Sequence, residues 1–280
     1  MNELLKVDHL TVDFSTDQGT VHAVRDVSFC VYPQEVLGIV GESGSGKSQT
    51  MYSVMGLLAD NGKITAEDIL FDGKKIHESA FKNHTEYEKT MQHIRGNDMA
   101  MIFQDPMTFL NPVLKIGTQL IEPLQNHTKM SKKECEQKAI ELMRQVGIPS
   151  PEKRMNQYPY EFSGGMRQRI IIAMALACNP KLIIADEPTT ALDVTIQAQV
   201  LELIQDMKEK LGSSVIMITH DLGVVASLCN RIAIMYGGKI VEIGKMCIRD
   251  RFLIRGRCRC GKNTRRAGIT KFRCKDRATV

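Results

Sequence analysis

The segment 41–48, GESGSGKS, constrains what this chain can fold into more than any other part of the sequence. It matches the pattern G-x-x-x-x-G-K-[ST], with a predicted buried strand before it (36–40) and a predicted helix after it (49–58). Glycines at these positions let the backbone point successive N–H groups inward at a helix N-terminus, which forms a nest for a phosphate group. The segment therefore predicts an α/β fold with a phosphate-binding P-loop.

The polar residues of this P-loop have separate tasks in such a site. Lys47 would reach the β- and γ-phosphates of a nucleotide, and the Ser48 hydroxyl would be a ligand of Mg²⁺. A chance turn rich in Gly and Ser could carry the same letters, but the strand and the helix on either side favour the P-loop. The residues expected to bind the nucleotide here are Gly41, Ser43, Gly44, Ser45, Gly46, Lys47, Ser48 and Gln49.

An apolar run that ends in two acids is the natural partner of the P-loop. Residues 181–188 read KLIIADEP and predict a buried strand that ends at Asp186 and Glu187. Asp186 could hold the hydration shell of Mg²⁺, and Glu187 could orient and deprotonate a water molecule in line with the γ-phosphate. Alone, the segment could equally be a strand followed by a solvated acidic turn. The P-loop in the same chain favours the catalytic interpretation.

A third segment, 161–169 with the sequence EFSGGMRQR, predicts a second phosphate-binding device. Ser163 is a good N-cap, and the apolar run 170–178 continues the helix. The N–H groups left open at Gly164 and Gly165, together with the Ser163 hydroxyl, could bind a phosphate at the helix N-terminus. One nucleotide does not need two such devices, unless the second serves a nucleotide held by another subunit. The alternative is a simple capped core helix.

Taken in order, these segments resemble the ATPase subunit of an ABC transporter over residues 4–245. The P-loop is followed by the SGG segment, and the acidic strand end lies 23 residues after Ser163. Asp193 in the triplet ALD and His220 at a predicted strand end follow in turn. The stretch MIFQDPMTFLNP, the signature FSGGMRQR and the run ADEPTTALDVT resemble the ATPases of oligopeptide, dipeptide and nickel importers.

The resemblance implies a role for each residue that matches a family motif. Gln104 would touch Mg²⁺ or the attacking water, and His220 would contact the γ-phosphate. The expected catalytic residues are Glu187, His220 and Gln104, and the expected metal ligands are Ser48, Gln104 and Asp186. The residues expected to meet the ATP of an opposing subunit are Ser163, Gly164, Gly165, Gln168 and Asp193. Phe14 is expected to stack on the adenine ring, with His22 as the competing candidate.

The patterns and the resemblance together predict the fold class and its parts. The fold class is α/β, with a P-loop NTPase core of the RecA type, an N-terminal antiparallel β subdomain and an inserted α-helical subdomain. The ATPase domain is expected to cover 1–245, with the helical insertion at about 107–165. Its clearest predicted helix is 132–146. The predicted strands are 4–14 and 22–31, which alternate, and 35–40, 181–186 and 214–220, which are apolar.

Charge and cysteine content change abruptly after residue 245. The tail 246–280 carries nine Arg, three Lys and two Asp, a net charge of +10, so the other 245 residues carry −5 of the total of +5. Three interpretations compete: a zinc or iron–sulfur site on its cysteines, a surface for anionic lipid, and sequence that is not native. The cysteine spacings of 11, 2 and 14 match no known zinc pattern, and MCIRDR resembles translated adapter or out-of-frame DNA. We therefore expect a disordered or non-native tail.

The body of the chain is mildly acidic, so nucleic acid is not expected as a partner. Its longest apolar run, 170–178, is nine residues and falls short of the roughly 18 that a membrane span needs. The N-terminus lacks the basic and apolar regions of a secretory signal. The chain is therefore expected at the cytoplasmic face of the cell membrane, as a peripheral subunit bound to separate membrane chains.

The resemblance implies the ATP-binding, ATP-hydrolysing subunit of an importer for peptides or nickel, with ATP and Mg²⁺ as cofactors. Its partners would be a second ATPase subunit, identical or related, two transmembrane permease subunits and an extracytoplasmic solute-binding protein. The alternative is a soluble ABC ATPase of chromosome structure, DNA repair or translation. Only 115 residues separate Ser48 from Ser163, however, and no sustained heptads lie between them. A P-loop kinase or GTPase would leave 163–169 unexplained.

Overall fold

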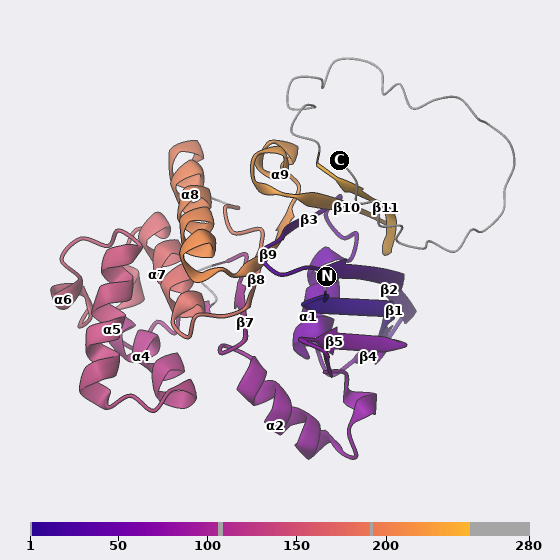
Figure 1. Cartoon of the computed structure of the whole chain (residues 1–280), viewed down its shortest axis with the longest axis horizontal. Coiled ribbons are helices and arrows are strands. Elements are labelled where there is room, and N and C mark those ends of the chain that lie inside the picture. The colour runs from indigo at the N-terminus through magenta and orange to yellow at the C-terminus, as the bar shows by residue number, and fades with distance from the viewer. Residues whose placement is uncertain (1, 106–108, 191–192, 247–280) are drawn as a thin grey trace, which may run out of the picture. The chain divides into compact units, whose positions relative to one another are not determined.

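A six-stranded sheet carries the strand that precedes the P-loop. The computed structural model describes residues 2–105, 109–190 and 193–246, with only the backbone for Met207. The strands of this sheet are β3 (Val36–Val40), β7 (Met99–Ile102), β8 (Leu182–Asp186), β9 (Ser214–Thr219), β10 (Arg231–Tyr236) and β11 (Lys239–Lys245). They lie in the order β11-β10-β3-β9-β8-β7. Five of them run parallel, and β11 pairs antiparallel with β10 at one edge (Figure 1).

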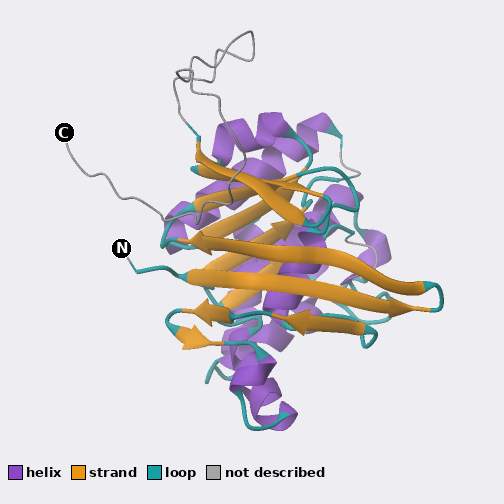
Figure 2. Ribbon diagram, turned by 90° about the vertical axis from the view of Figure 1, so that its right-hand side faces the viewer, coloured by secondary structure: helices purple, strands orange, loops and turns teal. Residues whose placement is uncertain are grey.

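A second, antiparallel sheet is built mainly from the N-terminal part of the chain. Its strands are β1 (Leu5–Thr16), β2 (Gly19–Val31), β4 (Gly62–Thr65), β5 (Asp68–Phe71) and β6 (Lys74–Lys75). The order is β2-β1-β5-β6, and β4 also pairs with β1. The alternating stretches at the N-terminus therefore form the predicted antiparallel pair, whose long strands are seen side by side in Figure 2.

Helices connect the strands of both sheets. The α-helices are α1 (Lys47–Met55), α2 (His84–Ile94), α4 (Ile116–His127), α5 (Lys132–Gln145), α6 (Pro151–Arg154), α7 (Gly164–Leu176), α8 (Val194–Leu211) and α9 (Leu222–Leu228). Short 3-10 turns lie at Glu78–Ala80 and Pro159–Glu161. Among the described residues, no helix combines the length and the apolar character needed to cross a bilayer.

Two hydrophobic cores form on opposite faces of the six-stranded sheet, because side chains alternate along its strands. In β3, Leu37 and Ile39 belong to the core that includes residues of α1, β1 and β2, so α1 lies between the two sheets. Val36 and Val40 belong to the core formed with α4, α5, α7 and α8. All five residues of β3 are buried, as expected for a parallel strand covered on both faces.

In the described part of the stretch predicted to be a helical insertion, helices α4, α5 and α6 lie between β7 and α7. The N-terminus of α5 is fixed by a capping box, in which Ser131 and Glu134 bond each other's backbone N–H groups. Both α4 and α5 pack against α7, and Figure 1 shows this group on the side of the core away from β1 and β2. The bounds predicted for this subdomain remain a prediction.

The predicted fold class is confirmed, with small differences at the strand ends. The three apolar runs form β3, β8 and β9, each within one residue of the predicted ends. The hairpin β10–β11, the short strands β4 to β6 and helix α2 are additions that the sequence analysis did not predict. Residues 2–246 belong to one compact unit, and the interpretations of the tail lie outside the described residues.

Candidate active site

The P-loop joins β3 to α1, and its glycines are required by geometry. Gly44 and Gly46 have φ values of 77° and 96°, in the region that other residues rarely adopt. A Cβ at Gly46 would lie 2.4 Å from the carbonyl oxygen of Ala23, and one at Gly41 would lie 2.2 Å from the carbonyl oxygen of Met235. The loop is therefore pressed against β2 and β10, and no side chain fits at either position.

Lys47 starts α1 and folds its side chain back over the loop. Its Nζ donates to the carbonyl oxygens of Gly41 and Glu42 at 2.9 and 2.8 Å, and its residue is only 5% exposed. An ammonium group has three donors, so one N–H remains beyond these two bonds. The lysine is thus held at the mouth of the loop with a positive charge and a donor available for a phosphate oxygen.

Asp186 ends β8 directly beside the P-loop helix. The Ser48 hydroxyl donates to its Oδ1 at 3.0 Å, whereas Oδ2 is buried and has no hydrogen-bond partner among the described residues. Burial raises the pKa of the Asp186 carboxyl, and the hydrogen bond from Ser48 opposes this shift. A fully buried carboxylate with one unpaired oxygen is a site prepared for a cation.

Glu187 is held by three side chains that meet at one of its oxygens. Its Oε2 accepts from Gln104 Nε2 at 3.2 Å and from the Thr190 hydroxyl at 2.9 Å, and it lies 3.4 Å from His220 Nδ1. The residue has a φ of 45°, and its N–H donates to the carbonyl oxygen of Ile218 at 3.0 Å. A non-glycine residue at positive φ is uncommon, and these contacts fix its side chain.

A single cavity of about 640 Å³ brings most of the predicted residues together. It is lined by Ala23, Glu42, Ser43, Gly44, Gly46, Lys47, Ser48, Gln49, Gln104, Glu187 and His220. Four segments that are distant in sequence therefore meet at the carboxyl ends of β3, β7, β8 and β9, the edge where open α/β sheets bind ligands. Two residues of the predicted P-loop set, Gly41 and Ser45, do not line the cavity. The Ser45 hydroxyl is buried and has no hydrogen-bond partner among the described residues.

The SGG segment lies outside this cavity, at the N-terminus of α7. Ser163 caps the helix by accepting from Met166 N at 3.4 Å, and both Ser163 and Gly164 are exposed. A Cβ at Gly164 would meet open space, whereas one at Gly165 would lie 2.8 Å from Ile196 Cγ2 on α8. Asp193, also exposed, caps α8 by accepting from Ile196 N at 2.9 Å. Two adjacent helix N-termini thus face solvent.

Two predicted site residues lie neither in the P-loop cavity nor at the exposed N-termini of α7 and α8. Gln168 is 1% exposed, with its Nε2 buried and unpaired among the described residues, so its amide lies inside the protomer rather than on the exposed end of α7. Phe14 is partly buried against Gly62 and does not line the cavity. The competing His22 is exposed and pairs with Asp13 at 2.7 Å. The roles assigned to these residues remain predictions.

The structure also adds residues that sequence reasoning missed. The Thr190 hydroxyl donates to Glu187, and the only signal for it in the sequence is a hydroxyl residue three positions after the acid, in a turn that contains proline.

A second cavity, of about 570 Å³, lies beside the C-terminus of α1. Two pairs of its polar side chains bond each other, His84 with Glu78 at 2.8 Å and Ser79 with His77 at 2.7 Å. No group of three or more His, Cys, Asp or Glu side chains in the described part of the chain is arranged to hold a metal ion.

Fold and site together define a P-loop ATPase, and comparison with known proteins gives its family. The family model described as ABC transporter matches residues 24–190. The chain belongs to this family, and it is an ABC ATPase cassette that binds ATP.

Several relatives are transport proteins. The chain is 54% identical over 245 residues to the oligopeptide transport ATP-binding protein OppD of Bacillus subtilis, a match that covers 87% of this chain and 66% of that protein. It is 55% identical to the dipeptide transport ATP-binding protein DppD of the same organism, covering 87% and 71%. The chain thus spans about two thirds of the length of these relatives.

Solved structures of ATP-binding cassettes share the fold. The dimeric cassette MJ0796 in a post-hydrolysis state, bound to ADP and Pi, matches with a TM-score of 0.74 and 27% identity, covering 87% of this chain and 99% of that one. The cassette cbiO1 of Clostridium perfringens, part of the complex cbiONQ, matches with a TM-score of 0.71 and 26% identity, covering 88% and 90%.

Proposed function

We propose that this chain is the subunit that binds and hydrolyses ATP in a peptide importer, paired with a second ATPase subunit and with separate membrane permeases. The observation that carries the proposal is the division of phosphate-binding groups between the P-loop cavity and the exposed N-terminus of α7 outside it. The B. subtilis relatives, an oligopeptide and a dipeptide transport ATP-binding protein, support peptides as cargo. The cassette solved as a dimer with ADP and Pi supports both pairing and hydrolysis.

In this proposal the P-loop binds the phosphates of ATP. Its inward N–H groups and the N-terminus of α1 offer partial positive charge, and Lys47 adds a full one. Lys47 would exchange its bonds to the loop carbonyl oxygens for bonds to the phosphates. The loop carbonyls therefore keep the lysine in place before ATP arrives.

The strand-end residues fit Mg²⁺. The unpaired Asp186 Oδ2 and the Ser48 hydroxyl are hard oxygen ligands, and their neighbourhood is fixed by the 3.0 Å bond between Ser48 and Asp186. This ion takes one or two protein ligands when phosphates complete its shell, which agrees with a site that has few carboxylates. When bound, Mg²⁺ supplies positive charge to the phosphate oxygens during transfer.

Glu187 would be the general base. The donors at its Oε2 leave Oε1 to accept a proton from a water molecule beside the γ-phosphate. Gln104 and His220 both contact this carboxylate and line the same cavity, so each could also reach the water or the phosphate. Holding the base in one orientation lowers the entropic cost of the attack.

The exposed SGG segment would complete the site of a second copy. One P-loop cavity surrounds the γ-phosphate only in part, and the Ser163 hydroxyl with the N–H groups of Gly164 and Gly165 would close the open side. Since ATP would lie between the two subunits, its binding would favour closure of the dimer, and its hydrolysis would let the subunits separate. The exposed side chains of Asp193 and Val194 at the start of α8 would join the same contact.

Closure would then act on the permeases, which the helical insertion is expected to contact. With an extracytoplasmic solute-binding protein to deliver cargo, these partners would keep the chain at the cytoplasmic face of the membrane. The test is isolation from detergent-solubilised membranes. We expect the chain to co-purify with permease subunits, and its recovery only in a salt-extracted soluble fraction without them would contradict the proposal.

Glu187→Gln tests the mechanism. We expect this variant to bind ATP and to dimerise with it, because the P-loop is unchanged, but not to turn over, because the base is absent. Glu202→Gln, at an exposed position on α8, is the matched control and should keep wild-type turnover. Full ATPase activity in Glu187→Gln would show that Glu187 is not the base.

A further inference from the structure

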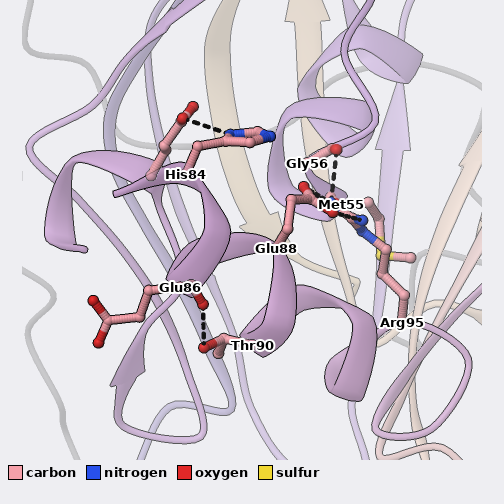
Figure 3. A network of polar contacts seen from close by, with 8 residues as sticks. Met55, Gly56, His84, Glu86, Glu88, Thr90 and Arg95 are labelled. Carbon is pink, nitrogen blue, oxygen red and sulfur yellow. Dashed lines mark hydrogen bonds and ion pairs between the residues drawn. The ribbon is translucent and has the colours of Figure 1, made fainter. Parts of the chain in front are cut away.

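The far end of the P-loop helix is held by one arginine. Arg95 Nε donates to the carbonyl oxygen of Met55 at 2.7 Å, and its Nη2 donates to that of Gly56 at 2.8 Å. These carbonyls belong to the last turn of α1 and its C-cap, where four backbone acceptors lack partners within the helix. Figure 3 shows the guanidinium group against this helix end.

Glu88 on α2 fixes the orientation of that guanidinium group. Its Oε2 accepts from Arg95 Nη1 at 3.0 Å and its Oε1 from Nη2 at 3.2 Å, so the two side chains meet as a two-pronged pair (Figure 3). The hydrogen bond from Arg95 lowers the pKa of the Glu88 carboxyl, which keeps it ionised. We call Met55, Gly56, Glu88 and Arg95 the Arg95 clamp.

The Arg95 clamp is closely packed at Gly56. This residue is the C-cap of α1 with a φ of 63°. A Cβ there would lie 2.1 Å from the Tyr87 hydroxyl oxygen and 2.7 Å from Arg95 Nη2. The helix end, α2 and Arg95 therefore meet at a separation that only glycine allows. The partial negative charge at the C-terminus of a helix also stabilises a cation in this position.

The clamp joins the two elements that carry Ser48 and Gln104. Ser48 lies in the first turn of α1, at the opposite end from the clamp. Arg95 directly follows α2 and is bridged to Met99, the first residue of β7, whereas Gln104 comes two residues after β7 ends. The next strand, β8, pairs with β7 along its length and carries Asp186. Apolar packing accompanies the clamp: Tyr52 of α1 stacks on Phe103, next to Gln104, with ring centroids 6.4 Å apart, and methionines of α1 and β7 share one core. Such packing lacks the directional bonds with which the clamp fixes the register.

We propose that Arg95 is a positioning residue of the ATPase site, which fixes α1 in register with β7 and so sets how Ser48, bonded to Asp186, is placed relative to Gln104. The inference rests on the proposed function, in which these three residues surround Mg²⁺. It predicts a defect that depends on Mg²⁺ and leaves the phosphate nest intact, because the P-loop conformation is set by its own glycines and by β2 and β10.

The experiment measures binding of the fluorescent, non-hydrolysable analogue mant-AMPPNP to the full chain, which has no Trp to interfere. In EDTA, we expect Arg95→Met to keep the affinity of the parent chain within about twofold. In a Mg²⁺ titration, its half-saturating Mg²⁺ concentration should rise about tenfold, the lower end of what is found when groups that orient metal ligands are removed. Arg95→Lys keeps the positive charge but not the two-pronged hydrogen bonding of the guanidinium group. Its half-saturating Mg²⁺ concentration should therefore also be higher than that of the parent chain.

Arg154→Met is the matched control, because Arg154 also donates to a carbonyl oxygen, that of Pro149 at 2.9 Å, and to Gln157 at 3.2 Å. It lies in α6, which packs against α5 in the group of helices that follows β7. We expect it to change the melting temperature without changing the Mg²⁺ titration. If Arg95→Met does not fold, Glu88→Gln and Arg95→Lys carry the test, since both retain most of the clamp.

A Mg²⁺ titration of the Arg95 variants that matches the parent chain, with only thermal stability reduced, would overturn the proposal and make the clamp a structural contact. Equal loss of affinity with and without Mg²⁺ would overturn it as well, because the defect would then lie in the P-loop. Failure of the proposed function has a different outcome: the parent chain itself would not bind the analogue, or its binding would not respond to Mg²⁺.

Discussion

Replacing Thr190 tests whether the donors around Glu187 orient a base. Thr190→Val removes the hydroxyl that donates to Glu187 Oε2 at 2.9 Å and keeps the shape of the side chain. A hydrogen bond to a charged group contributes about 1.5–3 kcal/mol. Gln104 also donates to this oxygen and His220 Nδ1 lies 3.4 Å from it, so we expect the loss to lie nearer 1–2 kcal/mol, about 5- to 30-fold in rate.

A second effect opposes the first. A carboxylate that loses a donor becomes a stronger base, which restores part of the lost rate. Because Gln104 and His220 still contact the same oxygen, the change in basicity is limited, and the loss of orientation dominates. We therefore expect the kcat of Thr190→Val to fall about 2- to 10-fold.

The assay is steady-state ATP hydrolysis, with Thr190→Ser as the control that keeps the hydroxyl. The KM for ATP should not change, because Thr190 does not line the nucleotide cavity. Thr190→Ser should keep most of the activity. A kcat for Thr190→Val equal to that of Thr190→Ser, or higher than that of the wild type, would refute the idea that orientation of Glu187 limits turnover.

Three further predictions concern other parts of the site. Gly46→Ala should abolish binding of mant-ATP, because its Cβ would lie 2.4 Å from the Ala23 carbonyl oxygen at a φ of 96°; wild-type affinity would contradict the geometry. Asp186→Asn should remove the effect of Mg²⁺ on nucleotide affinity and raise the melting temperature of the nucleotide-free chain at pH 7, since burial raises the pKa of Asp186 and an ionised form there is destabilising. Glu88 contributes stability above its ordinary pKa of 4.5, which is lost as pH falls through the lower folded value. In that window Glu88→Gln should flatten the dependence of melting temperature on pH, and an unchanged profile would show that the pair with Arg95 contributes nothing.

The sequence predicted the parallel core well because its signals are local. In β3, β8 and β9 every residue is buried, so each strand is apolar without interruption until its end, and such runs are easy to find. The P-loop also has a local signal, because the positive φ angles of Gly44 and Gly46 require glycine within one turn. The chemistry of these segments could therefore be predicted along with their structure.

The missed features depend on contacts between distant segments. Strands β4 to β6 are two to four residues long, and pairing rather than their own pattern stabilises them: β4 and β5 pair with β1, and β6 pairs with β5. Helix α2 is polar on most of its surface and buries only Tyr87, Met91 and Ile94. Arg95 looks like any arginine in sequence, and its importance comes from carbonyl oxygens at positions 55 and 56.

The geometry of Glu187 and the exposure of Ser163 together bear on how hydrolysis would be controlled. Within one chain, Gln104, Thr190 and His220 already hold the expected base, so the base does not need a partner to become oriented. In the part of the chain that the structure describes, the second set of predicted phosphate donors does not line this cavity, since the SGG segment lies at a separate, exposed helix end. Under the proposed function, a second subunit would therefore control turnover by stabilising charge that develops on the phosphate, not by assembling the base. It follows that Ser163→Ala should lower turnover while leaving ATP affinity for the isolated chain unchanged, and a loss of affinity in the isolated chain would contradict this division.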